Sequence, residues 1–267
     1  MLRRYGIRPS KRWGQHFLVS ARVLQQTLAA AALSRQDAVL DVGAGIGTLT
    51  LALSERGGWV TAVEADRSLL PALRAVLEAS ANVQIVEGDI LRLRPAALFS
   101  GPEDAPRKVV ANLPYNVASA VVMQLLDADA AIRTVVVTVQ REVAERLCAR
   151  PGGRRWSRRP RIVARIPPGA FYPPPAVESA LVEIVPRSTP AVPLADKGAF
   201  FRVVGAGFGQ RRKTLANAVS AGLGLSRDAV AAACRTAGID PGARAETLDL
   251  EAFARLTEAL GAEWRAR

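Results

Sequence analysis

Short apolar runs alternate with segments of helical spacing along the first 140 residues of this 267-residue chain. The runs are AVLDVGAG, WVTAVEAD, VQIVEGDI, KVVANLPY and RTVVVTVQ, at 38–45, 59–66, 83–90, 108–115 and 133–140. Segments such as 20–33 and 118–128 space their apolar residues as one face of a helix does, and Ser20 is a suitable N-cap. Strands that alternate with helices predict βαβ units and a mostly parallel sheet.

The pattern changes after residue 150. A basic stretch, GGRRWSRRPR, leads into AFYPPPAVESALVEIV, which combines a proline corner with a late strand. The proline-containing segment 186–196 is typical of a linker, and helical spacing dominates from Gly198 onward. We therefore expect two domains, residues 1–190 and residues 191–267.

Positive charge is abundant and clustered. The formal net charge is +12 and the pI is near 11.0. Residues 1–22 hold six basic residues and no acid, and residues 141–165 hold nine arginines against two glutamates. A polyanion, first of all nucleic acid, is the expected partner. The alternative is a proteome that favours arginine throughout.

Other residue types exclude several classes of protein. Cys148 and Cys234 form no CxxC pair, so neither a disulfide framework nor a zinc site is expected, and a reducing cytoplasm fits. His16 is the only histidine, which argues against a His-rich metal site, and we expect no metal. We find no signal-peptide core and no apolar run of about 18 residues, so no membrane association is expected.

Polar residues end four successive predicted strands. The turn DVGAGIG, at 41–47, follows the first strand, and Glu64, Asp89 and Asn112 end the next three. In an open α/β sheet, ligands bind at this edge, and a glycine turn lets them approach the backbone. An acid about twenty residues after such a turn accepts ribose hydroxyls, so the pattern favours an adenosine-containing cofactor. The alternative for Glu64 is a surface charge.

The tetrapeptide NLPY, at 112–115, has three interpretations: a plain turn, a structural corner, or a pocket for a flat base with an amino group. The Asn112 side-chain oxygen and a backbone carbonyl near Leu113 can accept both N–H bonds of such an amine. Pro114 fixes the turn without adding a donor. Tyr115 can stack on the base, which contributes roughly 1–3 kcal/mol. At the end of a nucleotide-type strand, the pocket is the favoured interpretation.

These motifs resemble those of the S-adenosylmethionine-dependent rRNA adenine N6-dimethyltransferases, specifically the small-subunit type called KsgA in bacteria. The resemblance runs through KRWGQHFL, DVGAGIG, VEAD, GD, NLPYN, QREVAERL and PPGAFYPPPAVESALV. Two C-terminal motifs, FGQRRKTLANAV and GIDPGARAETL, are similar to the small-subunit type and not to the large-subunit resistance methylases.

The resemblance implies a fold and a reaction. The fold is α/β: a Rossmann-like methyltransferase sheet with helices on both faces, then a small all-α C-terminal domain that binds RNA. The reaction is dimethylation of two adjacent adenines in a hairpin loop near the 3′ end of small-subunit rRNA. The cofactor is S-adenosyl-L-methionine. The partner is small-subunit rRNA or a small-subunit precursor, met in the cytoplasm during ribosome assembly, and we expect a monomer.

The resemblance also assigns site residues. Those expected to bind the cofactor are His16, Leu18, Gly43, Glu64, Asp89 and Asn112. Those expected at the target base are Asn112, Leu113, Tyr115 and Phe171. The alternatives are a packing role for His16 and a core position for Phe171. The basic residues expected to bind RNA are Arg154, Arg155, Arg158, Arg159, Arg211, Arg212 and Lys213.

One segment departs from the family. After QREVAERLCARPG the family usually carries a Tyr-Gly turn and a long apolar strand, whereas this chain has the shorter, arginine-rich GRRWSRRPRIVARIPP. The hairpin that ends the sheet is therefore expected to be short or missing. Three other functions stay open: a large-subunit rRNA or DNA adenine methyltransferase, a non-catalytic assembly factor on the same fold, and a nicotinamide dehydrogenase.

Overall fold

The structure is a computed structural model that describes residues 2, 4–10, 13–128, 131–148, 160–186, 194–210, 213–261 and 264. Contacts divide the chain into two units, Met1–Cys148 with Ser157–Pro186, and Ala149–Trp156 with Arg187–Arg267. The boundary expected between residues 190 and 191 falls within 187–193, outside the described residues.

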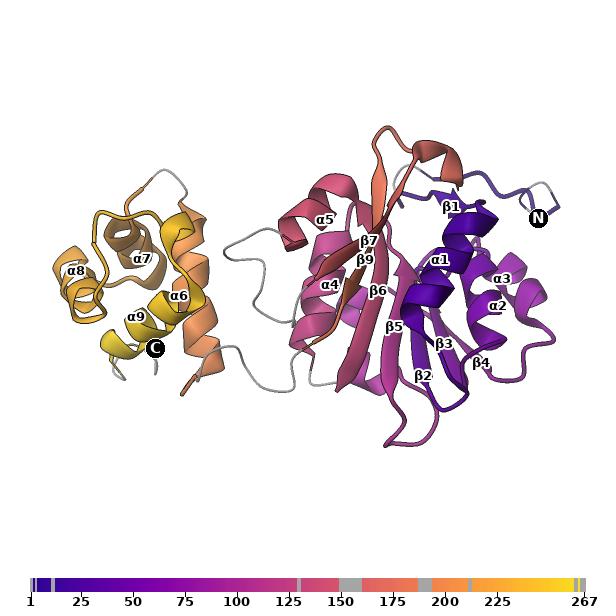
Figure 1. The fold of residues 1–267 in the computed structure, drawn as a ribbon, viewed down its shortest axis with the longest axis horizontal. Coiled ribbons are helices and arrows are strands. Elements are labelled where there is room, and N and C mark those ends of the chain that lie inside the picture. Colours follow the sequence, from indigo (N-terminus) through magenta and orange to yellow (C-terminus); the bar gives the residue numbers. More distant parts are fainter. Residues whose placement is uncertain are drawn as a thin grey trace. The chain divides into compact units, whose positions relative to one another are not determined.

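Within the described part of the first unit, seven strands form one sheet in the order β4-β3-β2-β5-β6-β9-β7 (Figure 1). Five strands are parallel: β2 (Ala38–Val42), β3 (Trp59–Glu64), β4 (Val83–Glu87), β5 (Arg107–Asn112) and β6 (Ile132–Gln140). The chain builds the sheet outward from β2 to β4, and then restarts at β5 on the other side of β2. Ligands bind in open α/β sheets at such a switch point, beyond the carboxyl ends of the strands.

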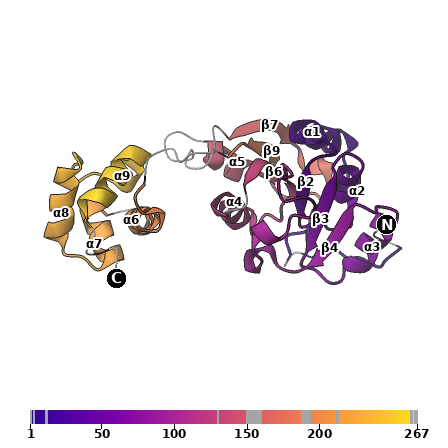
Figure 2. The same ribbon diagram turned by 90° about the horizontal axis from the view of Figure 1, so that it is seen from below.

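Helices cover both faces of the sheet, because successive strand residues point to opposite sides. On one face lie α1 (Ala21–Ala31), α2 (Thr48–Ser54) and α3 (Leu70–Leu77), and on the other lie α4 (Ala118–Asp127) and α5 (Arg141–Cys148) (Figure 2). Val39 packs with α1 and α2, whereas its neighbour Leu40 packs with α4. Ser20 caps α1 by accepting a hydrogen bond from the Val23 amide, as predicted.

The hairpin at the sheet edge is formed, so it is not missing, and its outer strand spans six residues. Strand β7 (Arg161–Ile166) pairs antiparallel with β9 (Ser179–Ile184), and β9 also pairs antiparallel with β6. An irregularity between Ile162 and Ala164 interrupts the register. Six residues are enough because an edge strand needs a partner on one side only. The arginine-rich residues 151–159 lie outside the described chain.

A second, two-stranded sheet joins distant parts of the sequence. Strand β1 (Phe17–Leu18) pairs antiparallel with β8 (Phe171–Tyr172), and the Val19 amide donates to the Ala170 carbonyl at 2.9 Å. Short 3-10 helices lie at Ile90–Arg92 (η1), Pro95–Ala97 (η2) and Pro168–Ala170 (η3). The pairing of β1 with β8 fixes the N-terminal segment, which reaches the site described below, beside the proline corner.

The described residues of the second unit form helices: α6 (Lys197–Gly209), α7 (Leu215–Leu223), α8 (Arg227–Thr236), η4 (Ala245–Thr247) and α9 (Leu250–Ala259). Asp196, Ser226 and Asp249 cap three of them by accepting backbone hydrogen bonds. Phe200 and Phe253 lie in a separate apolar core. The predicted fold class, an α/β sheet followed by an all-α part, is confirmed. No helix within the described ranges is long and apolar enough to cross a membrane.

Candidate active site

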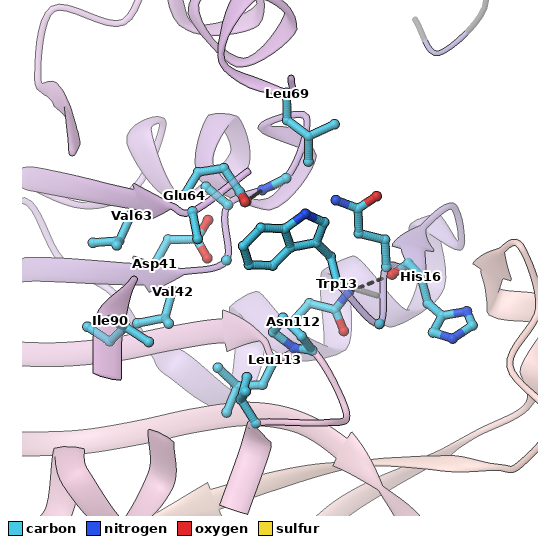
Figure 3. A pocket seen from close by; sticks show the side chains of 18 of the residues that line it. Trp13, His16, Asp41, Val42, Val63, Glu64, Leu69, Ile90, Asn112 and Leu113 are labelled. Atoms are coloured by element: carbon cyan, nitrogen blue, oxygen red, sulfur yellow. Dashed lines mark hydrogen bonds between the residues drawn. The ribbon is translucent and has the colours of Figure 1, made fainter. Parts of the chain in front are cut away.

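A pocket opens at the carboxyl ends of β2, β3 and β5 and is closed in part by the N-terminal segment (Figure 3). The lining includes almost every residue that the sequence analysis assigned to the cofactor or the base: His16, Leu18, Gly43, Glu64, Asp89, Asn112, Leu113 and Tyr115. These residues come from positions up to 99 apart in the sequence, and the parallel sheet brings them to one edge.

The glycine turn after β2 is held by its neighbours on both sides. The Gly43 and Ala44 amides donate to the Val63 carbonyl at 2.8 and 3.0 Å, which ties the turn to the end of β3. Gly43 has φ +72°, and a Cβ at this position would lie 3.2 Å from Cδ of Pro114. The turn therefore needs glycine both for its backbone conformation and for its close approach to the NLPY loop.

Glu64 is buried and its carboxylate is fixed by backbone amides. Oε2 accepts from the Gly45 amide at 2.7 Å and Oε1 from the Asp66 amide at 2.8 Å. Burial raises the pKa of this carboxyl, and the two amide bonds act against that rise. Glu64 is therefore not a surface charge, and each oxygen keeps a lone pair with which to accept a ligand hydroxyl.

Asp41, on β2, is the most unusual group in the pocket. Its side chain is fully buried; Oδ2 accepts from the Thr50 hydroxyl at 2.7 Å, and Oδ1 has no hydrogen-bond partner. Burial is the main cause that raises its pKa from 3.8 to about 7, and the charge of Glu64 adds to the rise. A buried carboxylate oxygen without a partner is costly unless a ligand supplies a cation or a donor.

Asp89 lies just beyond β4 and caps η1. Its Oδ1 accepts from the Leu91 amide at 3.0 Å, which orients the carboxylate. Asp89 is thus placed at the pocket, and its Oδ2 lies 3.9 Å from Nε of Arg92, an exposed side chain.

Asn112 ends β5, and its amide has a defined orientation. Nδ2 donates to the His16 carbonyl at 3.0 Å, so the side-chain oxygen is the acceptor that remains for a ligand. The Leu113 amide donates to the Thr138 carbonyl at 3.2 Å, which anchors the loop to β6. The NLPY segment therefore presents the Asn112 side-chain oxygen to the pocket as an acceptor.

Tyr115 is held at its hydroxyl and on one ring face. The hydroxyl is hydrogen-bonded to Oγ of Ser179, the first residue of β9. The His16 ring stacks on the Tyr115 ring, with centroids 5.2 Å apart and planes 25° apart. His16 Nδ1 lies 2.7 Å from the Pro173 carbonyl, so Nδ1 carries the proton. Burial raises the pKa of Tyr115, which keeps its hydroxyl neutral.

Several pocket residues were missed by sequence reasoning. Trp13 points its indole into the pocket (Figure 3). Gln15 joins two segments: it donates to Asp66 at 2.7 Å and accepts from the Ser10 amide at 2.8 Å. Asp41 could have been found, because an acid inside the apolar run AVLDV needs an explanation. Trp13 and Gln15 lie in KRWGQHFL, so this N-terminal motif was the signal that could have placed them at the site.

Phe171 is not among the pocket-lining residues. It is 3% exposed and packs in an apolar cluster with Val23 and Leu28 of α1. Only its backbone is linked to the pocket, through its pairing with Leu18. This is the core position weighed as the alternative for Phe171, and a role at the target base stays a prediction.

Most of the predicted RNA-binding residues lie outside the described chain: Arg154, Arg155, Arg158, Arg159, Arg211 and Arg212. Lys213 is described, and it is exposed just before α7. Their assignment to RNA therefore stays a prediction.

Comparison with known proteins identifies the family. The profile described as "Ribosomal RNA adenine dimethylase" matches residues 7–261. The chain belongs to this family. The family predicted from the sequence motifs is confirmed, and the dimethylases of this family are methyltransferases that use S-adenosyl-L-methionine.

Two curated relatives illustrate the match. The ribosomal RNA small subunit methyltransferase A of Dehalococcoides mccartyi strain CBDB1 is 42% identical over 263 residues, which cover 96% of this chain and 90% of the relative. The protein of the same name from Anaeromyxobacter dehalogenans strain 2CP-C is 42% identical over 277 residues, covering 98% of this chain and 96% of the relative.

Two solved structures of methyl-transferring enzymes have the same fold. The 23S rRNA methyltransferase ErmE aligns with a TM-score of 0.64 and 28% identity, over 91% of this chain and 99% of ErmE. A dimethyladenosine transferase from Plasmodium falciparum aligns with a TM-score of 0.67 and 22% identity, over 90% of this chain and 96% of that chain. At 22% identity, the likeness to the Plasmodium falciparum protein shows the fold alone.

Proposed function

We propose that this protein dimethylates the N6 amino groups of two adjacent adenosines in a hairpin loop near the 3′ end of small-subunit rRNA, with S-adenosyl-L-methionine as methyl donor. The observation that carries the proposal is the orientation of Asn112, whose amide nitrogen is engaged by the His16 carbonyl. The side-chain oxygen is left as an acceptor at the pocket, which is what a target amine requires.

The residues of the pocket fit the cofactor. Its methionine part carries an ammonium and a sulfonium, and the orphaned Oδ1 of Asp41 offers a negative partner. The cradle at Gly43 has no side chain to block a close approach, and Glu64 and Asp89 offer carboxylate oxygens to the ribose and the adenine. When bound there, the cofactor supplies an electrophilic methyl group.

The chain supplies position and electrostatics. The amino group of adenine is a poor nucleophile because its lone pair is delocalised into the ring. The Asn112 oxygen and a backbone carbonyl near Leu113 accept its two N–H bonds and favour a pyramidal nitrogen with a localised lone pair. The Tyr115 ring supplies a surface on which the target adenine stacks once it has turned out of the RNA. Because an N6 proton can leave to water after methyl transfer, no general base is required, and catalysis rests on orientation.

The choice of the small subunit rests on the relatives. The curated relatives at 42% identity over nearly the whole chain are named small subunit methyltransferases, whereas ErmE, named for 23S rRNA, is 28% identical. A non-catalytic assembly factor would have no need of Asp41, Glu64 and Asn112 around one pocket. A dehydrogenase has no use for NLPY. These alternatives are disfavoured.

The assignment of residues to RNA binding rests on the positive charge of the chain. We assign residues 191–267 to RNA binding, with Lys213 and its neighbours Arg211 and Arg212 as phosphate contacts. The second basic cluster is Arg154, Arg155, Arg158 and Arg159. With a net charge of +12, the chain is suited to a polyanionic precursor of the small subunit. We place it in the cytoplasm as a monomer without a metal.

The proposal is tested with labelled cofactor and small ribosomal subunits that lack the modification, followed by digestion of the RNA to nucleosides. We expect N6,N6-dimethyladenosine at two adjacent positions of the small-subunit RNA. Large subunits that lack their own adenine methylation are the control. Label only in the large subunit would establish the large-subunit alternative, and label in neither would favour the non-catalytic one.

A further inference from the structure

The proline corner AFYPPPAVES contacts two pocket-lining residues, His16 and Tyr115, through groups that the chemistry above does not use. Its first contact is the Pro173 carbonyl, which accepts from the His16 ring at 2.7 Å. Its second is the Ser179 hydroxyl, which is hydrogen-bonded to Tyr115. Both contacts converge on one aromatic ring, because His16 in turn stacks on Tyr115.

Ser179 is a rigid anchor for this contact. It is fully buried and is the first residue of β9, a strand paired on both sides. Its backbone lies opposite Gln140 of β6 and Ile166 of β7. Tyr115, by contrast, lies in the loop after β5. The hydroxyl pair therefore links a loop residue to the interior of the sheet.

We propose that Ser179 is a positioning residue for methyl transfer: its hydroxyl fixes the ring of Tyr115 in the orientation in which the ring receives the target adenine. This inference rests on the proposed function, in which Tyr115 is the wall on which the base stacks. A stacking wall is effective only when its plane is set before the base arrives, since a free ring must be ordered at the moment of binding. The His16 ring limits the tilt of the same plane.

The simpler interpretation is that Ser179 only satisfies a buried tyrosine hydroxyl. That role would stabilise the fold without affecting the reaction. The two interpretations differ in the rate of a single turnover measured on folded protein, and in the exposure of the target base within the complex.

The experiment is a double-mutant cycle on the full-length protein with Tyr115→Phe, Ser179→Ala and the double variant. Single-turnover methyl transfer is measured with saturating cofactor and small ribosomal subunits that lack the modification. Each single change should lower the rate about three- to tenfold, the scale of one lost hydrogen bond. The double variant should be no slower than either single one, because both changes remove the same bond.

A matched control is Ser54→Ala. Ser54 is also a buried serine, whose hydroxyl donates to the Leu51 carbonyl at 2.7 Å, and it does not line the pocket. It should leave the single-turnover rate unchanged. A short hairpin RNA with 2-aminopurine at the target position gives a second readout: the fluorescence rise on binding should be smaller for Ser179→Ala and Tyr115→Phe than for Ser54→Ala.

The outcomes separate this inference from the proposed function. If Tyr115→Ala methylates at the normal rate, Tyr115 is not the wall and the site assignment fails. If Tyr115→Ala is slow but Tyr115→Phe and Ser179→Ala react normally, only the positioning role fails. Strictly additive losses would also overturn it. Should Ser179→Ala fold poorly, Tyr115→Phe tests the same bond from the other side.

Discussion

Two buried aspartates, Asp37 and Asp41, lie at opposite ends of strand β2 and meet opposite conditions. Asp37 accepts from the Ser34 amide at 2.6 Å and pairs with Lys108 at 3.0 Å, both through Oδ2. Asp41 has only the Thr50 hydroxyl, and its Oδ1 has no partner. The charge of Asp37 is thus paired with Lys108 within the protein, whereas Oδ1 of Asp41 is left for a donor or cation on a ligand.

Strand β5 repeats the contrast. Near its start, Lys108 donates to the Ala31 and Ala32 carbonyls at 3.2 and 2.8 Å besides pairing with Asp37. At its end, Asn112 uses its amide nitrogen within the protein and keeps its oxygen for the pocket. At the amino ends of β2 and β5, the charged groups are paired within the protein. We call this the closed end. At the carboxyl ends, Asp41 and Asn112 keep acceptor oxygens for a ligand, and we call this the open end. The difference separates polar groups that stabilise the fold from polar groups that bind ligands.

The largest effect should come from breaking the closed end. Lys108→Met keeps the apolar stem but leaves Asp37 buried without its cation. Breaking a buried ion pair costs about 3–5 kcal/mol, so the urea midpoint of unfolding should fall steeply. The folded fraction should still methylate at nearly the normal single-turnover rate. Normal stability in Lys108→Met would mean that the Asp37–Lys108 pair contributes no more to the free energy of unfolding than a surface ion pair does.

The open end should give the reverse result. Asn112→Ala should lower the single-turnover rate about 10²–10³-fold, because its bonds to the amine strengthen in the transition state. RNA affinity and the free energy of unfolding should change little. Asn82→Ala is the control, since Asn82 precedes β4 and donates only to backbone carbonyls, such as that of Ser54 at 3.0 Å. It should lower stability and spare the rate. A normal rate in Asn112→Ala would make this asparagine a structural corner.

The pH dependence of stability should identify the orphaned acid. Because burial raises the pKa of Asp41 to about 7, the folded chain keeps a proton that the unfolded chain loses near pH 4. The stability from this group is complete at low pH and is lost as the pH rises through 7. The wild type should therefore lose about 2–3 kcal/mol more than Asp41→Asn between pH 5 and pH 8. Parallel curves in urea unfolding would contradict this.

The smallest effect in the series concerns Glu64. Glu64→Ala removes the acceptor for the cofactor ribose and should weaken cofactor binding by about 1–3 kcal/mol in calorimetry. Glu87→Ala is the control, because Glu87 lies beside Glu64 in the register of β3 and β4 but pairs with exposed Arg67 and does not line the pocket. Its affinity should match the wild type. Equal losses in both variants would indicate a general charge effect and not a ribose contact.

The architecture of the first 140 residues could be predicted from local pattern. Alternating strands and helices imply a parallel sheet, and a parallel sheet gathers the ends of its strands. Glu64, Asp89 and Asn112 could therefore be placed together from the sequence alone, because each lies at the end of an apolar run. The sequence left open whether the β7 hairpin forms at all, because its formation depends on pairing with β9, which local spacing does not specify.

The contacts that orient the site could not be predicted. Tyr115 and Ser179 are 64 residues apart, and nothing in NLPY specifies its partner. Phe171 is an aromatic residue beside a proline corner, and such a residue suits a base pocket or a core equally well. Which of the two it occupies depends on how β8 pairs with β1. Long-range pairing decides these details, and local spacing does not encode it.

Because Gly43 lies close to Pro114, the glycine turn at 41–47 and the NLPY loop at 112–115 constrain each other's substitutions. A Cβ on residue 43 would lie 3.2 Å from Cδ of Pro114, so a side chain there requires the proline ring of the NLPY loop to shift by a few tenths of an ångström. A substitution in one loop is therefore tolerated only if the conformation of the other loop can accommodate it. Anyone who redesigns this pocket for a bulkier methyl donor or a different base has to vary both loops in the same library.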